Sequence, residues 1–127
     1  MKYLGIDYGT KRLGIAISDE EGRVAFPKTT FPNTPSVADE IISLLEKERI
    51  THVVLGEPNT VQGGKNPLQE KISALQKKLE ERGMKVSLEA EMWSSIEARR
   101  FQGKKESNDA SAAAIILQRF LEKPKKQ

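Results

Sequence analysis

Acidic residues follow three apolar segments of this sequence, in positions where carboxylates can bind metal ions. Asp7 ends the segment "YLGID", Glu57 follows "VVLG" and Glu91 follows "VSLEA". Ligands of an open α/β sheet collect beyond the carboxyl ends of its parallel strands. If the three segments are neighbouring parallel strands, these acids share one edge of the sheet.

A fourth acidic candidate, Asp109, begins the last helical pattern of the chain. It shares the spacing of one helix face with small and apolar residues, namely Ala112, Ala113, Ile116 and Phe120. A carboxylate on a buried face is costly unless it is paired or binds a metal ion. The alanines would let this helix approach the sheet closely and bring Asp109 to the strand ends. The alternative is an acid that complements the helix dipole, or a cap formed with Asn108.

Converging carboxylates can perform one specific reaction, the hydrolysis of a phosphodiester bond. They hold two divalent ions about 4 Å apart, of which one activates water and the other stabilises the leaving oxygen. The sequence has no cysteine and one histidine, His52, which excludes disulfides, thiolate sites and multi-histidine zinc sites. Because carboxylate ligands favour hard cations, we expect Mg²⁺ or Mn²⁺ as the cofactor.

Basic residues are unevenly distributed in a chain whose formal net charge is only +3. They form three groups, which are Lys11 and Arg12 in the first turn, Arg99, Arg100, Lys104 and Lys105 before the last helix, and Lys123, Lys125 and Lys126 at the C-terminus. Such groups indicate a polyanionic partner, and the alternative is a role in solubility alone. Because the first turn borders the acidic edge, we expect Lys11 and Arg12 to contact phosphate, and the alternative is ordinary charge in a hairpin turn. Thr10 could cap that turn or help to position the phosphate.

Periodicity in the sequence predicts a mixed α/β fold. Strand patterns occupy residues 2–7, 12–18, 23–31, 51–56 and 86–90. Three helix patterns begin at Thr34-Pro35, Asn66-Pro67 and Ser94-Ser95, and a fourth covers residues 108–121. Ser94 and Ser95 form a capping box, and the same helix N-terminus could receive a phosphate. We expect a five-stranded mixed sheet flanked by helices, with a three-strand antiparallel meander followed by two parallel strands.

The length of 127 residues fits one domain, which we place at 1–122, followed by a basic disordered tail at 123–127. No apolar run reaches the roughly 18 residues that span a membrane, and the N-terminus lacks a signal-peptide pattern. We therefore expect a cytoplasmic protein without a membrane partner. Asp19 ends the antiparallel second strand, so it is expected in a turn at the edge opposite to Asp7.

The motifs resemble the YqgF family, the pre-16S rRNA nucleases related to Holliday junction resolvases. "GIDYGTKRLGIAISD" looks like the opening motif of the family, and "DASAAAIILQ" matches D-x-x-A-A-x-x-I-L-Q. "VVLGEPNTVQGG" resembles the G-L-P segment, and "AEMWSSIEA" stands where the family has D-E-R-L-T-T-x-E-A. The resemblance implies an RNase H-like fold and a magnesium- or manganese-dependent nuclease that acts on structured RNA or branched DNA.

By this resemblance, the catalytic and metal-binding acids are Asp7, Glu91 and Asp109. The D-E-R of the family is Ala90-Glu91-Met92 in this chain, and Met92 cannot bind a phosphate as an arginine does. Loss of that arginine could weaken the grip on the substrate. Glu57 stands where the family usually has leucine. We hypothesise that it is an added metal ligand, and the alternative is a solvent-facing loop residue.

Other functions compete with the nuclease. Sugar kinases and actin have a phosphate-binding hairpin with a similar "GIDxGT" pattern, but they need two such domains, which 127 residues cannot supply. A non-catalytic nucleic-acid-binding module would bind its ligand without metal-dependent cleavage. The sequence favours a nuclease that processes the 5′ end of pre-16S rRNA or resolves Holliday junctions. Junction resolution would require paired active sites and hence a homodimer.

Overall fold

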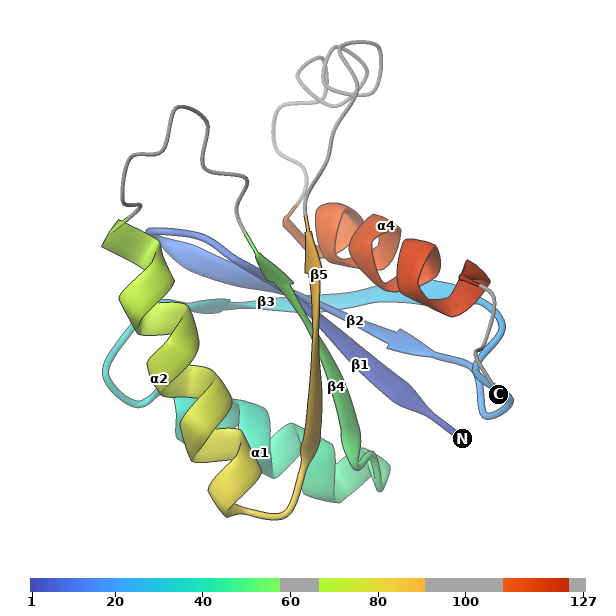
Figure 1. The fold of residues 1–127 in the computed structure, drawn as a ribbon, viewed down its shortest axis with the longest axis horizontal. Coiled ribbons are helices and arrows are strands. Elements are labelled where there is room, and N and C mark those ends of the chain that lie inside the picture. Colours follow the sequence, from blue (N-terminus) through green and yellow to red (C-terminus); the bar gives the residue numbers. More distant parts are fainter. Residues whose placement is uncertain (58–66, 91–108, 124–127) are drawn as a thin grey trace, which may run out of the picture.

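A five-stranded mixed sheet with helices on both faces forms the protein (Figure 1). The computed structural model describes residues 1–57, 67–90 and 109–123. Its elements are β1 (Tyr3–Tyr8), β2 (Arg12–Ser18), β3 (Ala25–Pro32), α1 (Val37–Glu48), β4 (His52–Glu57), α2 (Pro67–Glu81), β5 (Lys85–Ala90) and α4 (Asp109–Glu122). The helix predicted from Ser94 lies outside the described residues.

The strand order in the sheet is β3-β2-β1-β4-β5. The first three strands pair antiparallel, whereas β4 is parallel to β1 and β5 is parallel to β4. The predicted combination of a meander and two parallel strands is therefore confirmed. It follows that β1, β4 and β5 are parallel neighbours whose carboxyl ends meet at one edge.

Side chains alternate across the sheet and build a hydrophobic core on each face. On one face, Leu4 and Ile6 of β1 pack with residues of α1 and α2, including Ile41, Leu45, Ile72 and Leu79. On the other face, Ala16 and Val54 pack against α4 through Ala113, Ile116 and Leu117. The predicted alternation in β2 is confirmed, because Leu13 and Ile15 belong to the first core and Ala16 to the second.

The helix predicted at Thr34-Pro35 begins two residues later, at Val37. The Val37 N–H donates to the Thr34 carbonyl at 3.0 Å, so Thr34–Val37 form a turn with proline at its second position. Ser36 precedes the helix and makes no side-chain capping hydrogen bond. Proline favours the second position of such a turn as well as the first position of a helix, and here the turn prevails.

The alternation of apolar and polar residues in β5 does not fully match which of its side chains are buried. Leu88 is 41% exposed, while its neighbour Glu89 is buried. This strand lies at the edge of the sheet, where α2 covers its face incompletely (Figure 1). In the part of the chain that the structure describes, no helix combines the length and apolar character needed to cross a membrane.

Candidate active site at the carboxyl edge of the sheet

The parallel strands β1 and β4 bring two of the predicted acidic positions to one edge of the sheet. Asp7 is the penultimate residue of β1 and Glu57 is the last residue of β4. Strand β5 ends at Ala90, directly before Glu91, which lies outside the described residues. This edge is the one at which open α/β sheets bind ligands.

Strand register decides which residues lie level with Asp7. Ile6 of β1 is opposite Leu55 of β4, so the next residues along the two strands are Asp7 and Gly56. Gly56 in turn is opposite Glu89 of β5. Glycine has no side chain between the two acidic residues of this row. Glu57 is one step further along β4 and pairs with Ala90.

Asp7 lies on the face of the sheet that α4 covers. Gly5, two residues earlier on the same face, contacts this helix so closely that an added Cβ would lie 2.8 Å from Leu117 Cβ and 3.2 Å from the Ala113 carbonyl oxygen. Because side chains of a strand alternate, Asp7 projects to the same side as Gly5. Its carboxylate is half-buried.

The direction of α4 brings its first residue, Asp109, to the same level. Ala113 lies over Gly5, and the Phe120 ring lies 5.8 Å from the Tyr3 ring at the start of β1, so the helix runs antiparallel to the strand. Asp109 precedes Ala113 by one turn, about 6 Å of helix. Asp7 follows Gly5 by two residues, about 7 Å of strand. The backbones of Asp109 and Asp7 therefore lie at one end of the helix–sheet contact.

A tight turn follows Asp7 and carries the basic residues of the site. The Gly9 N–H donates to the Arg12 carbonyl at 3.1 Å, and an added Cβ at residue 9 would lie 2.6 Å from that oxygen. Only glycine allows this turn to close. Thr10, Lys11 and Arg12 are exposed at its tip. The turn begins two residues after Asp7 and so lies next to the acidic edge.

Asp19 has a different role, as its position in the sequence predicts. Its Oδ1 accepts hydrogen bonds from the backbone N–H groups of Arg23 and Val24 at 2.7 and 3.1 Å. These backbone donors hold the pKa of the Asp19 carboxyl below its usual value. The residue follows the end of β2, so it lies at the edge opposite to Asp7. The expectation that it stabilises a turn is confirmed.

Glu89 is a buried acid that sequence reasoning missed. It is 6% exposed, and the Lys123 ammonium lies 2.7 Å from its Oε1, in an ion pair that lacks the direction of a hydrogen bond. In the sequence, Glu89 stands between Leu88 and Ala90 and looks like the exposed position of an alternating strand. Only the register reveals that it lies in one row with Asp7.

The remaining predicted site residues lie outside the described part of the chain. They are Glu91, Ser94, Ser95, Arg99, Arg100, Lys104 and Lys105. Among the side chains that the structure describes, which exclude those of Glu57 and Asp109, no group of three acidic or histidine residues could hold a metal ion. The donor chemistry at this edge is nevertheless that of carboxylate oxygens, which suits Mg²⁺ or Mn²⁺.

Comparisons with known proteins identify a family for this chain. A family model described as RuvX, Holliday junction resolvase, matches residues 1–123. Proteins named "Putative pre-16S rRNA nuclease" from Oleidesulfovibrio alaskensis and Nitratidesulfovibrio vulgaris are 37% and 36% identical to this chain. Each match covers 98% of this chain, and 94% and 95% of the two relatives. These matches confirm the resemblance to the YqgF family.

Solved structures confirm the predicted RNase H-like fold. RuvC from Thermus thermophilus has a TM-score of 0.61 at 18% identity, over 95% of this chain and 94% of that chain. A fowlpox virus resolvase in complex with Holliday junction DNA has a TM-score of 0.62 at 13% identity, over 96% of this chain and 97% of that chain. At these identities the similarity establishes the arrangement of strands and helices.

Proposed function

This chain belongs to the RuvX family of Holliday junction resolvases, and on this premise we propose that it is a divalent-metal-dependent endonuclease. The observation that carries the proposal is the contact of α4 with Gly5, which brings the start of that helix level with Asp7 at the carboxyl edge of β1, β4 and β5. Acidic positions from separate parts of the chain meet at an edge bordered by Lys11 and Arg12. A phosphodiester with its metal ions requires this combination of charges.

Asp7, Glu91 and Asp109 would hold the metal ions, with Glu57 as an additional ligand. When bound there, Mg²⁺ or Mn²⁺ would activate the attacking water and stabilise the leaving oxygen. Lys11 and Arg12 would hold the phosphate backbone beside the carboxylates, and Thr10 would help to position it. Arg99, Arg100, Lys104 and Lys105 would extend the basic surface along the nucleic acid, and the N-terminal serines Ser94 and Ser95 would bind a further phosphate.

The proposed substrate is precursor 16S rRNA, cleaved near its 5′ end. Relatives that match nearly the whole chain at 32–37% identity carry the name of a pre-16S rRNA nuclease. Holliday junction DNA is the second candidate, because the matching family model describes a junction resolvase. Junction resolution requires two active sites, so it predicts a homodimer, whereas cleavage of an RNA strand requires one site.

We propose that the activity is cytoplasmic and that a single domain at residues 1–122 carries it. Residues 123–127 would form a basic tail that adds to the attraction of nucleic acid. Within that tail, the Lys123 ammonium lies 2.7 Å from Glu89 Oε1, and residues 124–127 lie outside the described part of the chain.

The test compares two matched aspartate variants on both substrates. Wild type, Asp7→Asn and Asp19→Asn are incubated with precursor 16S rRNA and with a four-way DNA junction, in Mg²⁺, in Mn²⁺ or in a chelator. Wild type and Asp19→Asn should cleave when metal is present. The cleavage rate should be lower by at least about 100-fold in Asp7→Asn, and in wild type when the chelator replaces the metal. Asp19→Asn is the control because Asp19 holds a turn at the opposite edge. Cleavage that survives in Asp7→Asn would disprove the proposed site.

The departure at Ala90-Glu91-Met92 supports one other function, a nucleic-acid-binding module without catalysis. Methionine cannot form the paired hydrogen bonds that arginine makes to phosphate. This alternative predicts that wild type and Asp7→Asn bind both substrates equally well and that neither cleaves them. A metal-dependent product from wild type would exclude it.

The role of Glu57 has its own test. If it is a metal ligand, Glu57→Gln should lower cleavage by about tenfold or more and raise the Mg²⁺ concentration that gives half-maximal rate, because an amide is a weaker ligand than a carboxylate. Titration of Mg²⁺ in cleavage assays measures both effects. An unchanged metal dependence would show that Glu57 is an ordinary residue at a strand end.

A further inference from the structure

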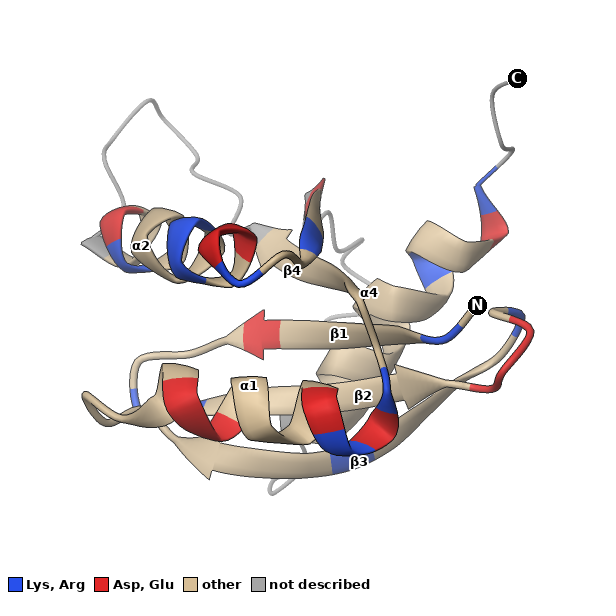
Figure 2. Cartoon of the chain, turned by 90° about the horizontal axis from the view of Figure 1, so that it is seen from below, with Lys and Arg blue, Asp and Glu red and all other residues tan. Residues whose placement is uncertain are grey.

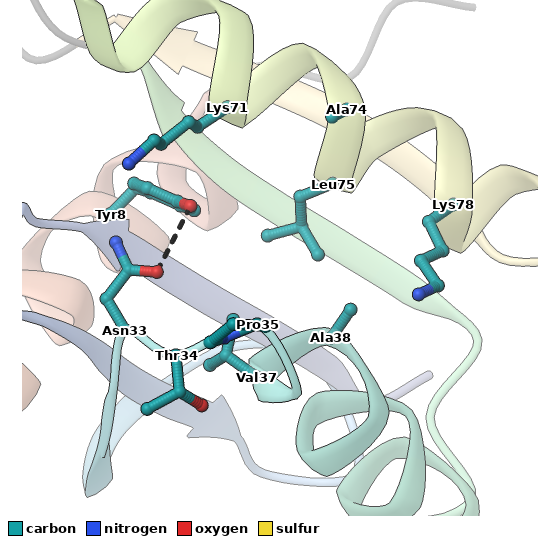
Figure 3. A pocket seen from close by; sticks show the side chains of 10 residues that line it. All are labelled: Tyr8, Asn33, Thr34, Pro35, Val37, Ala38, Lys71, Ala74, Leu75 and Lys78. Atoms are coloured by element: carbon teal, nitrogen blue, oxygen red, sulfur yellow. Dashed lines mark hydrogen bonds between the residues drawn. The ribbon is translucent and has the colours of Figure 1, made fainter.

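A cavity of about 410 Å³ lies between α1, α2 and the end of β1 (Figure 3). It is on the face of the sheet opposite to α4, since Tyr8, which lines it, belongs to the core formed with α1 and α2. Asp7, the adjacent residue, projects to the α4 face. The cavity is therefore separate from the candidate metal site but is reached from the same edge of the sheet.

Positive charge dominates the polar lining of this cavity. Lys71 and Lys78 line it from α2, and no acidic residue is among its described lining residues. They are seven positions apart, so they share one face of the helix. In Figure 3 the Lys71 side chain extends toward Tyr8, and that of Lys78 extends toward Ala38, at the other end of the cavity. In the part of the chain that the structure describes, neither ammonium group is in an ion pair.

The surface between the two lysines is apolar. It is formed by side chains of both helices and the turn before α1, namely Pro35, Val37, Ala38, Ala74 and Leu75. Cavities of a few hundred cubic ångströms with an apolar lining and a few polar groups are typical of small-molecule sites. An apolar surface between cations fits a ligand that combines a flat, weakly polar ring with an anionic group.

Hydrogen bonds connect this cavity to the turn that follows Asp7. The Tyr8 hydroxyl donates to Asn33 Oδ1 at 3.4 Å, as drawn in Figure 3. Asn33 Nδ2 donates to the Gly9 carbonyl at 2.9 Å, and the Asn33 N–H donates to the Lys11 carbonyl at 2.9 Å. Asn33 thus joins the wall of the cavity to the hairpin whose residues we propose to contact phosphate. A nucleic-acid strand that reaches the metal edge would pass close to the cavity.

We propose that this cavity binds a nucleoside monophosphate. The phosphate would interact with Lys71 or Lys78, and the sugar or base would lie on the apolar surface around Leu75. Such a unit has two sources, a nucleotide of the substrate strand or a free nucleotide. For the first source the inference rests on the proposed nuclease function, whereas for the second it is independent of that function.

Binding is tested without metal and without cleavage, so its failure is separate from failure of the nuclease assignment. Isotopically labelled protein is titrated with adenosine monophosphate, adenosine or inorganic phosphate while amide chemical shifts are recorded. Adenosine monophosphate should shift the amides of Tyr8, Asn33 and Leu75, and it should bind more tightly than either fragment. The double variant Lys71→Ala/Lys78→Ala should weaken this binding by about tenfold or more.

Lys77→Ala is the matched control, because Lys77 is an exposed lysine of the same helix that does not line the cavity. It should bind adenosine monophosphate like wild type. Because Lys71, Lys77 and Lys78 are all exposed, thermal unfolding should be similar in every variant. The proposal is overturned if no cavity amide shifts, if the double variant binds like wild type, or if inorganic phosphate binds equally well. Amide shifts of the cavity residues that follow protein concentration and not the concentration of adenosine monophosphate would also overturn it. They would mean that a second copy of the chain occupies the cavity.

A competition experiment distinguishes the two sources. A fluorescent single-stranded oligonucleotide is bound to the Asp7→Asn protein and then challenged with adenosine monophosphate. Displacement that disappears in the lysine double variant assigns the cavity to a nucleotide of the strand. Cavity shifts without displacement assign it to a free nucleotide. Either result supports the nucleoside monophosphate as the ligand.

Discussion

Asp7 and Asp19 follow similar apolar alternations in the sequence, yet they have opposite surroundings in the fold. Asp7 is half-buried on the face that α4 covers, where a carboxylate needs a partner or a metal ion. In Asp19 a side-chain oxygen instead accepts hydrogen bonds from two backbone N–H groups of its own turn, at the opposite edge of the sheet. A change at each residue should therefore have a different effect, catalytic for Asp7 and local for Asp19.

His52 is the residue whose titration should be visible in the stability of the protein. It is 7% exposed, its Nε2 lies 2.9 Å from Ser87 Oγ, and its ring packs against Tyr3 and Phe120. Burial, and to a smaller extent the positive charge of Lys85, lower its pKa below the usual value of 6.5. The folded protein therefore resists protonation of this ring more than the unfolded chain does.

The stability contributed by neutral His52 is fully present above the unfolded pKa and is lost as the pH falls from about 6.5 toward the lower folded pKa. The free energy of unfolding should decrease by at most about 1.4 kcal/mol per pH unit in that range. Urea unfolding between pH 7.5 and 5 measures this slope. Because the chain has one histidine, His52→Gln should flatten it. An equal slope in that variant would assign the titration to other groups.

At the scale of secondary structure, the contact between α4 and β1 organises the candidate site. Gly5 allows the helix backbone to approach the strand, and Ala113 and Leu117 occupy the space that a side chain at residue 5 would need. The contact determines how far along β1 the helix begins. Small residues on both elements are therefore required at this crossing.

Gly5→Ala should displace α4 from the sheet and reduce activity together with stability. Its Cβ would lie 2.8 Å from Leu117 Cβ, and such overpacking costs about 1–3 kcal/mol. Urea unfolding and cleavage assays measure the two effects. Ala16→Gly is the control, because Ala16 is buried in the same core but its loss of a methyl group leaves space instead of pushing the helix. Gly5→Ala with wild-type cleavage would show that the position of α4 does not control the site.

At the scale of the whole molecule, the helices carry charges of both signs, and an acidic residue lies at the edge of the sheet where β1 ends. Figure 2 shows mainly acidic residues on α1, both kinds of charge on α2, and an acidic position near the end of β1. The exposed Lys11 and Arg12 follow this end, at the tip of the hairpin. Net charge of only +3 gives weak general attraction for nucleic acid. Local basic residues should therefore supply most of the electrostatic affinity.

Nucleic-acid binding should weaken as salt increases, with a slope set by the number of phosphate contacts. Lys11→Ala and Arg12→Ala should each make the slope of log K against log salt concentration less negative by about 1. Fluorescence anisotropy with Asp7→Asn protein measures the slope without cleavage. Lys47→Ala, in the last turn of α1, is the control and should keep the wild-type slope. Equal slopes in all variants would remove the hairpin from the binding surface.

The sequence by itself determined the features that depend on local chemistry. Alternation in β2 assigns Leu13 and Ile15 to one face and Ala16 to the other, because the side-chain period of a strand is two residues. The parallel pairing of β4 and β5 follows from the helix that connects them. Together with the motif resemblance, these patterns predicted the fold and which strands end in acidic residues.

Only the tertiary structure decided which distant residues share a level, because register and helix position result from packing between remote segments. The row of Asp7, Gly56 and Glu89 depends on pairing across strands. The height of α4 depends on its contact with Gly5. The lysine-lined cavity depends on the distance between α1 and α2. These relations between remote segments do not follow from the spacing of residues within one segment. The sequence therefore identified the acidic residues, and only the tertiary structure showed which of them lie level with one another.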